Sequence, residues 1–110
     1  MEITWNDFEK VQMRVGTIIN VRPFPEAKKP AYQLSIDFGP EIGIRKSSAQ
    51  ITALYTPEQL MDRQVVAVVN FPKKQIGPFM SECLVLGALD TRGVVLLHPD
   101  INVSDGSRIA

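Results

Sequence analysis

Hydrophobic and polar positions alternate along several short stretches of the chain, which is the pattern of half-buried β-strands. The first stretch runs from Val11 to Val21, and Gly16 in its middle predicts a sharp bend. The second is more regular, because apolar side chains occupy every other position from Tyr32 to Phe38. Gly39-Pro40-Glu41 then predicts a turn into an antiparallel partner that begins at Ile42. The first half of the chain is therefore expected to be β-rich.

Three further strands are expected in the second half. The apolar run within Gln64–Phe71 is continuous, which is typical of a strand buried on both faces. Glu82–Ala88 and Val94–His98 form the last predicted pair, joined by a polar turn. Between the third and fourth strands, Thr56-Pro57-Glu58-Gln59 combines a Thr cap, a Pro and a Gln at the positions that begin a helix, which we expect to end near Arg63.

A second, shorter helix is expected to begin after Thr4 and to carry Trp5 and Phe8 on one side. A helix between the third and fourth of five short strands is the element order of an OB-fold. The sequence thus predicts a mainly all-β protein, a five-stranded OB-fold Greek-key barrel with short flanking helices. We expect one domain over residues 1–110, in which terminal segments 1–10 and 99–110 flank the barrel.

Composition narrows the possible partners and the cellular location. The chain has 110 residues, of which 45% are hydrophobic, and its 12 Lys and Arg balance 12 Asp and Glu. Any nucleic-acid binding must therefore come from local clusters of cations. Cys83 is the sole cysteine, so no internal disulfide can form, which fits a reducing compartment. Met1–Asp7 lacks a signal-peptide pattern, and the run Val65–Val69 is too short to span a bilayer. We expect a cytoplasmic protein without membrane insertion.

The residue types that carry catalysis do not form a recognisable pattern. His98 is the only histidine and has no Cys or carboxylate at ligand spacing, so no metal site is predicted. Cys83 stands in an apolar run and is expected to be a small core residue. No phosphate-binding glycine loop is present. The sequence therefore predicts a binding module rather than an enzyme, with no catalytic residue and no cofactor.

Two polar segments offer paired cations beside hydroxyl and amide side chains, a combination suited to phosphates, sugars or an extended peptide backbone. The alternative for the lysine pairs is protection of strand edges, and Lys28-Lys29 is expected to be a solvated loop tip. Phe71 and Phe79 could stack on bases, but we expect both to be partly buried in the barrel. The predicted ligand-binding residues are Arg45, Lys46, Ser47, Ser48, Gln50, Asn70, Phe71, Lys73, Lys74, Phe79, Ser81 and Glu82.

The chain resembles a known family over nearly its whole length. The segments that carry the resemblance are Met13–Ile18, Phe24–Ala27, the long run Ile36–Ile51, Val68–Pro72, Phe79–Glu82 and Leu84–Gly87. They are similar to the tRNA-binding-domain superfamily and, within it, to the CsaA branch of small export-related chaperones. The resemblance implies an OB-fold core, a homodimer built with the help of the terminal segments, and binding of unfolded or export-destined polypeptides without ATP. The protein-export machinery would be a further partner.

The wider superfamily binds tRNA by its shape, through a motif that this chain matches in part. The matching positions are Asn70, Lys74, Ser81 and Glu82. The departures are Lys73 and Pro78, which replace the motif's Pro and Gly, and Cys83 and Leu84, which replace its Gly and Met. Two functions follow from the resemblance: a chaperone as the leading hypothesis, and a tRNA-binding protein that uses the same basic and polar surface as the alternative. A purely structural subunit of another assembly is a third.

Overall fold

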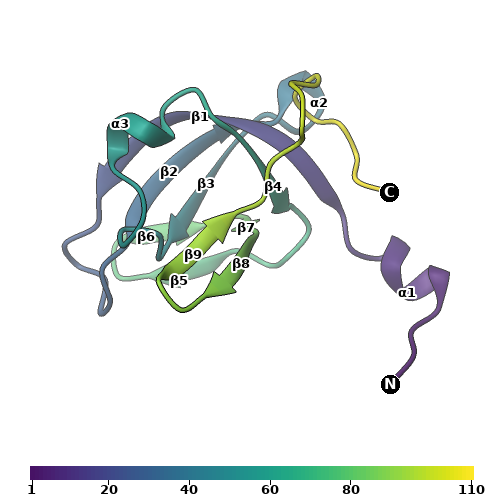
Figure 1. Cartoon of the computed structure of the whole chain (residues 1–110), viewed down its shortest axis with the longest axis horizontal. Coiled ribbons are helices and arrows are strands. Elements are labelled where there is room, and N and C mark those ends of the chain that lie inside the picture. The colour runs from purple at the N-terminus through teal and green to yellow at the C-terminus, as the bar shows by residue number, and fades with distance from the viewer.

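The computed structural model describes all 110 residues and shows a small, strongly curved antiparallel sheet (Figure 1). Its strand order is β3-β2-β1-β4-β7. The bounds are β1 Met13–Pro23, β2 Tyr32–Asp37, β3 Ile44–Ala49, β4 Gln64–Val68 and β7 Leu84–Val85. The sheet curls into a nearly closed barrel with short helices beside it, which confirms the predicted OB-fold.

Backbone and side-chain hydrogen bonds close the barrel between β3 and the segment that precedes β7. The Glu82 amide donates to the Lys46 carbonyl at 2.8 Å, and the Lys46 amide donates to Glu82 Oε1 at 2.9 Å. Two residues further along β3, the Ser48 amide donates to Ser81 Oγ at 3.1 Å. These bonds pair backbone groups of the edge strand β3 that would otherwise be left without hydrogen-bond partners.

The alternation predicted for β1 is interrupted, though not at Gly16. The register against β2 shifts between Ile18 and Asn20, which makes a β-bulge at Ile19. At the bulge the alternation of core-facing and solvent-facing residues changes register. Ile18, just before it, is fully buried, and Ile19 is exposed. A Cβ on Gly16 would lie 2.6 Å from Ile36 Cγ2, so glycine is required there for close packing. Close packing therefore accounts for Gly16, and the predicted bend there stays a prediction.

The second strand has the predicted orientation, and Leu34, Ile36 and Phe38 are buried. The predicted turn at Gly39-Pro40-Glu41 is instead a single helical turn, α2 (Gly39–Ile42). Gly39 has a φ of 87°, which lets the chain leave β2 and enter that turn at once. β3 consequently begins at Ile44 and pairs antiparallel with β2, as expected, from Asp37↔Ile44 to Tyr32↔Ala49.

Two hairpins follow β4: the first was not predicted, and the second confirms in part the predicted pairing of Glu82–Ala88 with Val94–His98. β4 ends at Val68, three residues earlier than expected. The first hairpin joins β5 (Lys74–Ile76) to β6 (Phe79–Ser81), and the second joins β8 (Gly87–Asp90) to β9 (Gly93–Leu96). The strand expected over Glu82–Ala88 is therefore divided: β7 pairs with β4, whereas β8 turns away to pair with β9.

Both predicted helix starts are confirmed. In α3 (Pro57–Leu60) the Gln59 amide donates to Thr56 Oγ1 at 3.3 Å and the Thr56 amide donates to Gln59 Oε1 at 2.9 Å, which is a capping box. α1 (Trp5–Glu9) has the same box between Thr4 and Asp7. α3 stops at Leu60, short of the predicted end, because the backbone of Met61 is already extended, with a ψ of 134°.

The terminal segments differ in how they meet the barrel. The C-terminal segment runs beside the start of β1, where the Val15 amide donates to the Ser107 carbonyl at 2.9 Å. The N-terminal α1 stands apart from the barrel in Figure 1, and its Trp5 is 83% exposed. The longest helix, α1, has five residues, so none of the helices could span a bilayer.

Candidate functional site

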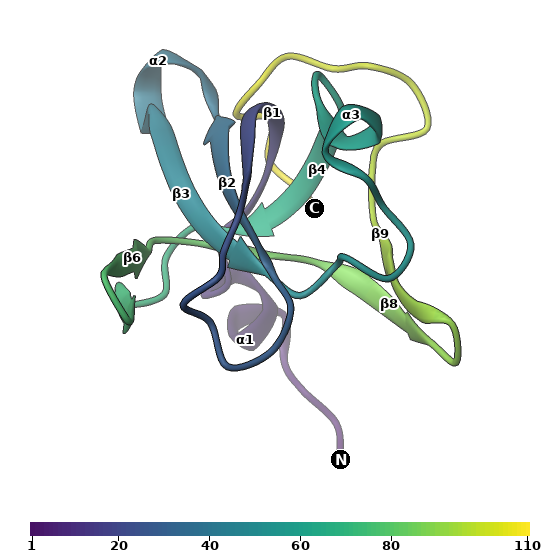
Figure 2. The same cartoon turned by 90° about the vertical axis from the view of Figure 1, so that its left-hand side faces the viewer.

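A groove of about 990 Å³ lies at the end of the barrel where β4 finishes and the two hairpins begin. Figure 2 shows the β5–β6 and β8–β9 hairpins on opposite sides of that end, joined by the stretch that contains β7. The groove is lined by residues from the end of β3, from the segment 71–76, from the stretch 81–87 and from the second hairpin. Its position depends on the barrel closure, because the Glu82–Lys46 bonds fix where the stretch with β7 starts.

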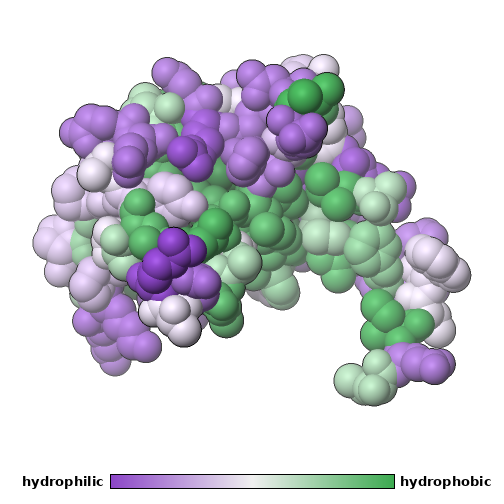
Figure 3. Space-filling model, viewed as in Figure 1, coloured by the Kyte–Doolittle hydropathy of each residue, from purple (hydrophilic) through white to green (hydrophobic).

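Apolar side chains make up more than half of the groove lining. Leu89 of the second hairpin is 90% exposed, Phe71 is 55% exposed and Leu84 is 48% exposed. Figure 3 shows apolar residues gathered in a band across the middle of the molecule, below a hydrophilic upper part. Solvent-exposed aliphatic and aromatic side chains around one hollow are a common mark of a binding surface.

Polar and cationic groups complete the rim. Lys73 and Lys74 come from the start of the first hairpin, and Gln50 follows β3. These three side chains are exposed. Such groups can donate to carbonyl oxygens of an extended peptide or to phosphate oxygens, while the apolar lining accepts side chains or bases.

The structure divides the twelve predicted ligand-binding residues into two sets. The residues that line the groove are Ser48, Gln50, Phe71, Lys73, Lys74 and Ser81. The residues that lie elsewhere are Arg45, Lys46, Ser47, Asn70, Phe79 and Glu82.

Several residues of the second set have structural contacts instead. Ser47 is a correction: its side chain is only 1% exposed inside the barrel, where no ligand can reach it. Phe79 packs on Phe24 with a ring-centroid distance of 5.3 Å, as a partly buried barrel aromatic should. Phe71, which lines the groove, was also expected to be partly buried, but its side chain is exposed. Lys46 is exposed beside the groove.

Asn70 and Arg45 tie the end of β4 to its surroundings. The Asn70 carboxamide accepts from the Gln12 amide at 3.0 Å and donates to the Lys10 carbonyl at 2.7 Å. It therefore fixes the chain between α1 and β1. Arg45, the second residue of β3, donates to the Val69 carbonyl at 3.5 Å. Both residues thus position segments next to the groove.

The Glu82 carboxylate links β3 to the first hairpin at this end of the barrel, through its hydrogen bond with the Lys46 amide and its ion pair with Lys73. Burial alone would raise the pKa of its carboxyl, but the hydrogen bond from the Lys46 amide and the Lys73 ammonium, 3.4 Å from Oε2, outweigh it. The pKa of Glu82 is therefore held below its ordinary value, and the group is a carboxylate at neutral pH. The ion pair holds the Lys73 ammonium beside Glu82, although the Lys73 side chain stays 64% exposed.

Neither candidate for covalent or metal chemistry has the surroundings that such chemistry needs. Burial, followed by the nearby Glu82 carboxylate, raises the pKa of Cys83 to about 12, so its thiol is protonated and weakly nucleophilic. Three or more His, Cys, Asp or Glu side chains gather nowhere in the structure as metal ligands would. The groove is suited to binding.

Sequence reasoning missed the apolar half of the groove. Leu84, Val85 and Leu86 form a continuous apolar run within the predicted strand Glu82–Ala88, which by itself does not show which of them are exposed. Leu89 offered a usable signal, since a large aliphatic residue there directly precedes the polar turn Asp90-Thr91-Arg92-Gly93. An unexplained aliphatic side chain next to a turn indicates either a contact or a binding surface.

Comparison with known proteins places the chain in a family. Residues 13–108 match the family model described as "Putative tRNA binding domain". The structure also superposes on the CsaA chaperone protein from Picrophilus torridus with a TM-score of 0.95, at 53% identity over 99% of this chain and 100% of that one. This chain belongs to the tRNA-binding-domain family, in its CsaA branch.

Other relatives agree with that placement. The chaperone CsaA from Bacillus anthracis gives a TM-score of 0.93 at 45% identity, with both chains fully covered. The methionine–tRNA ligase of Pyrococcus abyssi is 37% identical over 109 residues, which is 99% of this chain. The chain spans only 15% of that ligase. The likeness to the ligase therefore concerns one domain of a much longer protein.

Proposed function

We propose that this protein is a chaperone of the CsaA type that holds unfolded or export-destined polypeptides in the groove between its hairpins, without ATP. The observation that carries the proposal is the groove itself, where exposed apolar side chains lie beside polar and cationic groups. Unfolded chains present apolar side chains and unpaired backbone groups, and both would find partners there. The likeness to the CsaA chaperones of Picrophilus torridus and Bacillus anthracis supports the same function.

Binding, on this proposal, is simple sequestration. Phe71, Leu84 and Leu89 would take up apolar side chains of the client, because burying that surface removes it from water. Gln50, Ser48 and Lys74 would hydrogen-bond the client backbone or attract acidic side chains. No covalent step is needed, and we propose that the protein is not an enzyme and works in the cytoplasm, with the export machinery as a further partner.

We propose further that the protein acts as a homodimer. α1 stands away from its own barrel, with Trp5, Ile3 and Met1 exposed (Figure 1). Ile101 and Val103 of the C-terminal segment are also exposed. Exposed apolar residues on both terminal segments are better buried against a second copy, and a two-fold axis would bury the same patch on each chain.

The second candidate function is binding of tRNA. It is favoured by the match of residues 13–108 to the tRNA-binding-domain family and by Lys73 and Lys74 at the groove rim. The balanced charge of the chain argues against a long-range basic field, so any such binding would depend on those few cations.

Titration of the purified protein with an unfolded polypeptide and with tRNA, each at low and high salt, tests the proposal. Phosphate contacts release counterions, so affinity for tRNA should fall steeply with salt. Capture of polypeptide by apolar burial should change little or strengthen. Salt-resistant capture of the polypeptide supports the chaperone, and tight tRNA binding without any capture supports the alternative.

A further inference from the structure

The strand β8 has a backbone edge that the chain itself leaves unpaired. β8 pairs only with β9, in a two-stranded sheet. The phase of that pairing is fixed at the base of the hairpin, where the Leu97 amide donates to the Leu86 carbonyl at 3.2 Å. Because backbone groups of successive residues in a strand point to opposite edges, Ala88 faces β9, whereas Gly87 and Leu89 face away from it. The amides and carbonyls of these two residues have no hydrogen-bond partner within the chain.

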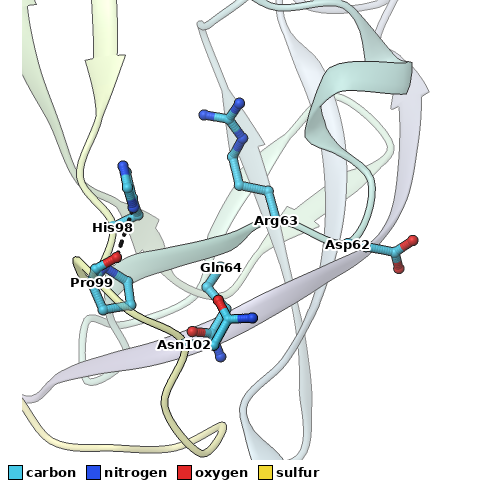
Figure 4. A pocket seen from close by; sticks show the side chains of 6 residues that line it. All are labelled: Asp62, Arg63, Gln64, His98, Pro99 and Asn102. Atoms are coloured by element: carbon cyan, nitrogen blue, oxygen red, sulfur yellow. Dashed lines mark hydrogen bonds between the residues drawn. The ribbon is translucent and has the colours of Figure 1, made fainter.

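Contacts on the other side of the hairpin agree with this phase. Leu96 lies opposite Gly87 and donates its amide to the Tyr55 hydroxyl at 2.9 Å rather than to β8. Beyond β9 the chain passes the small polar hollow of Figure 4, where Gln64 Nε2 donates to the Val103 carbonyl at 2.7 Å and Gln64 Oε1 accepts from the Val103 amide at 3.1 Å. The β9 side of the hairpin is therefore held by the protein itself, and the β8 edge is free.

The free edge of β8 borders the groove. Gly87 and Leu89 both line the groove, and so does Val94, which lies opposite Leu89 in β9 and shares its face. Ala88 and Leu89 are exposed, so the edge is open to solvent. β8 also contains no lysine, proline or bulge, the features by which exposed strand edges usually avoid pairing with other chains.

An edge of this kind recognises a partner through its backbone. A polypeptide in extended conformation can add to β8 as a third strand and exchange hydrogen bonds with the free groups of Gly87 and Leu89. Side chains of a strand alternate between its two faces, so every second side chain of the added strand would lie in the groove beside Leu89 and Val94. Those positions suit apolar residues, and the alternate positions lie on the exposed face of Ala88.

We propose that the groove captures extended polypeptide segments with apolar residues at alternate positions, by strand addition to the free edge of β8. The inference rests on the chaperone function proposed above and adds the conformation and the residue pattern of the client. Backbone recognition accepts many sequences, which a protein that holds unfolded chains requires. A helical segment is excluded, because its amides and carbonyls are already bonded to one another.

Two sets of N-methylated peptides test this mode of binding. The probe is a fluorescent octapeptide in which valine and threonine alternate, titrated against the full chain by anisotropy. Only every second N–H of a strand faces its neighbour, and methylating the four valine or the four threonine amides removes one set or the other. We expect one methylated peptide to bind at least about fivefold more weakly than the unmodified one, and the other within about twofold of it. Each methylated peptide is the matched control for the other.

The sensitive set also gives the direction of the added strand. Leu89 has its side chain in the groove, and residues opposite each other in an antiparallel pair share a face. Loss of binding in the valine set therefore indicates an antiparallel client, and loss in the threonine set a parallel one. Equal affinities of the two methylated peptides would overturn the inference.

Amide hydrogen exchange gives a second readout, on the protein side. At a free peptide concentration of about ten times Kd, exchange of the Gly87 and Leu89 amides should slow about tenfold, because only unoccupied edges then exchange. The Ala88 amide is the internal control, since it is already paired with β9 and should change little. Unchanged exchange of the Leu89 amide at that concentration would reject strand addition.

Two further results would contradict the inference in distinguishable ways. Protection of the Leu89 amide without peptide, lost on dilution of the protein, would assign the free edge to a second copy of the chain. Capture of an unfolded protein without any binding of the unmodified octapeptide would refute strand addition and leave the chaperone function standing. Failure to bind both would end the proposed function as well.

Discussion

Glu82 and Lys46 exchange two hydrogen bonds, one through each backbone amide, and so close the barrel beside the groove. The Glu82 carboxylate takes part in one of them and in an ion pair with Lys73. Glu82→Ala should therefore lower the free energy of unfolding by about 2 kcal/mol, the usual loss when a hydrogen bond to a charged group is removed. Urea denaturation at neutral pH checks this, and a variant as stable as the wild type would show that closure does not depend on the side chain.

Acid should weaken the same closure. The pKa of Glu82 is lower in the folded protein than its ordinary value of 4.5. Its contribution to stability is then fully present above pH 4.5 and is lost as the pH falls towards the folded pKa. We expect Glu82→Gln to remove part of the loss of stability that the wild type shows below that pH. Parallel curves of stability against pH for the two proteins would contradict this.

Leu89→Ser should impair polypeptide binding without unfolding the protein. Leu89 is 90% exposed in the groove lining, so its removal costs little packing but takes away apolar contact area. We expect a loss of affinity for an unfolded client of about fivefold or more, measured by fluorescence anisotropy. Ile44→Ser is the matched control, because Ile44 is an exposed aliphatic residue outside the groove. Equal effects of the two changes would mean that the groove has no special part in binding.

Trp5→Asp should separate the proposed dimer. The indole is exposed on its own chain, and an aspartate buried in an interface between two copies would be unpaired. Light scattering should give the mass of two chains for the wild type and of one chain for the variant, while the melting of the barrel itself changes little. A wild type that has the mass of one chain at micromolar concentration would end the dimer hypothesis.

Cys83 should be unreactive in the native protein. Its thiol is buried in the core, and a pKa of about 12 leaves almost no thiolate at pH 8. We expect labelling by a disulfide reagent to be slow until denaturant is added. Cys83→Ser should destabilise the fold by about 1–2 kcal/mol, because a hydroxyl replaces a thiol in apolar surroundings. Fast stoichiometric labelling of the folded protein would show that the thiol is accessible.

Local signals in the sequence predicted the fold well. The capping boxes at Thr4 and Thr56 involve residues three positions apart, so the sequence contains everything that determines them. The bulge at Ile19 could not be read in the same way, because it depends on the register against β2. The one-turn helix α2 was hidden by Gly39-Pro40, a pair that also suits a simple turn.

The candidate site was predicted only in part, for a geometric reason. Ser47 and Ser48 are adjacent in β3 and point to opposite faces of the sheet. Ser47 therefore lies inside the barrel, and Ser48 lines the groove. The alternation of side chains along a strand was enough to predict that only one of the two serines could reach a ligand. The exposure of Leu84 could not be foreseen, since it depends on where the chain leaves β7 for the β8–β9 hairpin.

The central claim, that the groove holds unfolded polypeptide, is tested most directly by the aggregation of a denatured client protein at physiological salt, followed by light scattering. The wild type should suppress aggregation, Leu84→Asp with Leu89→Asp should abolish that suppression, and Lys73→Glu with Lys74→Glu should reduce it only in part. A wild type that leaves aggregation unaltered, yet binds tRNA tightly at the same salt and loses that binding in the lysine variant, would contradict the chaperone and establish the tRNA-binding alternative.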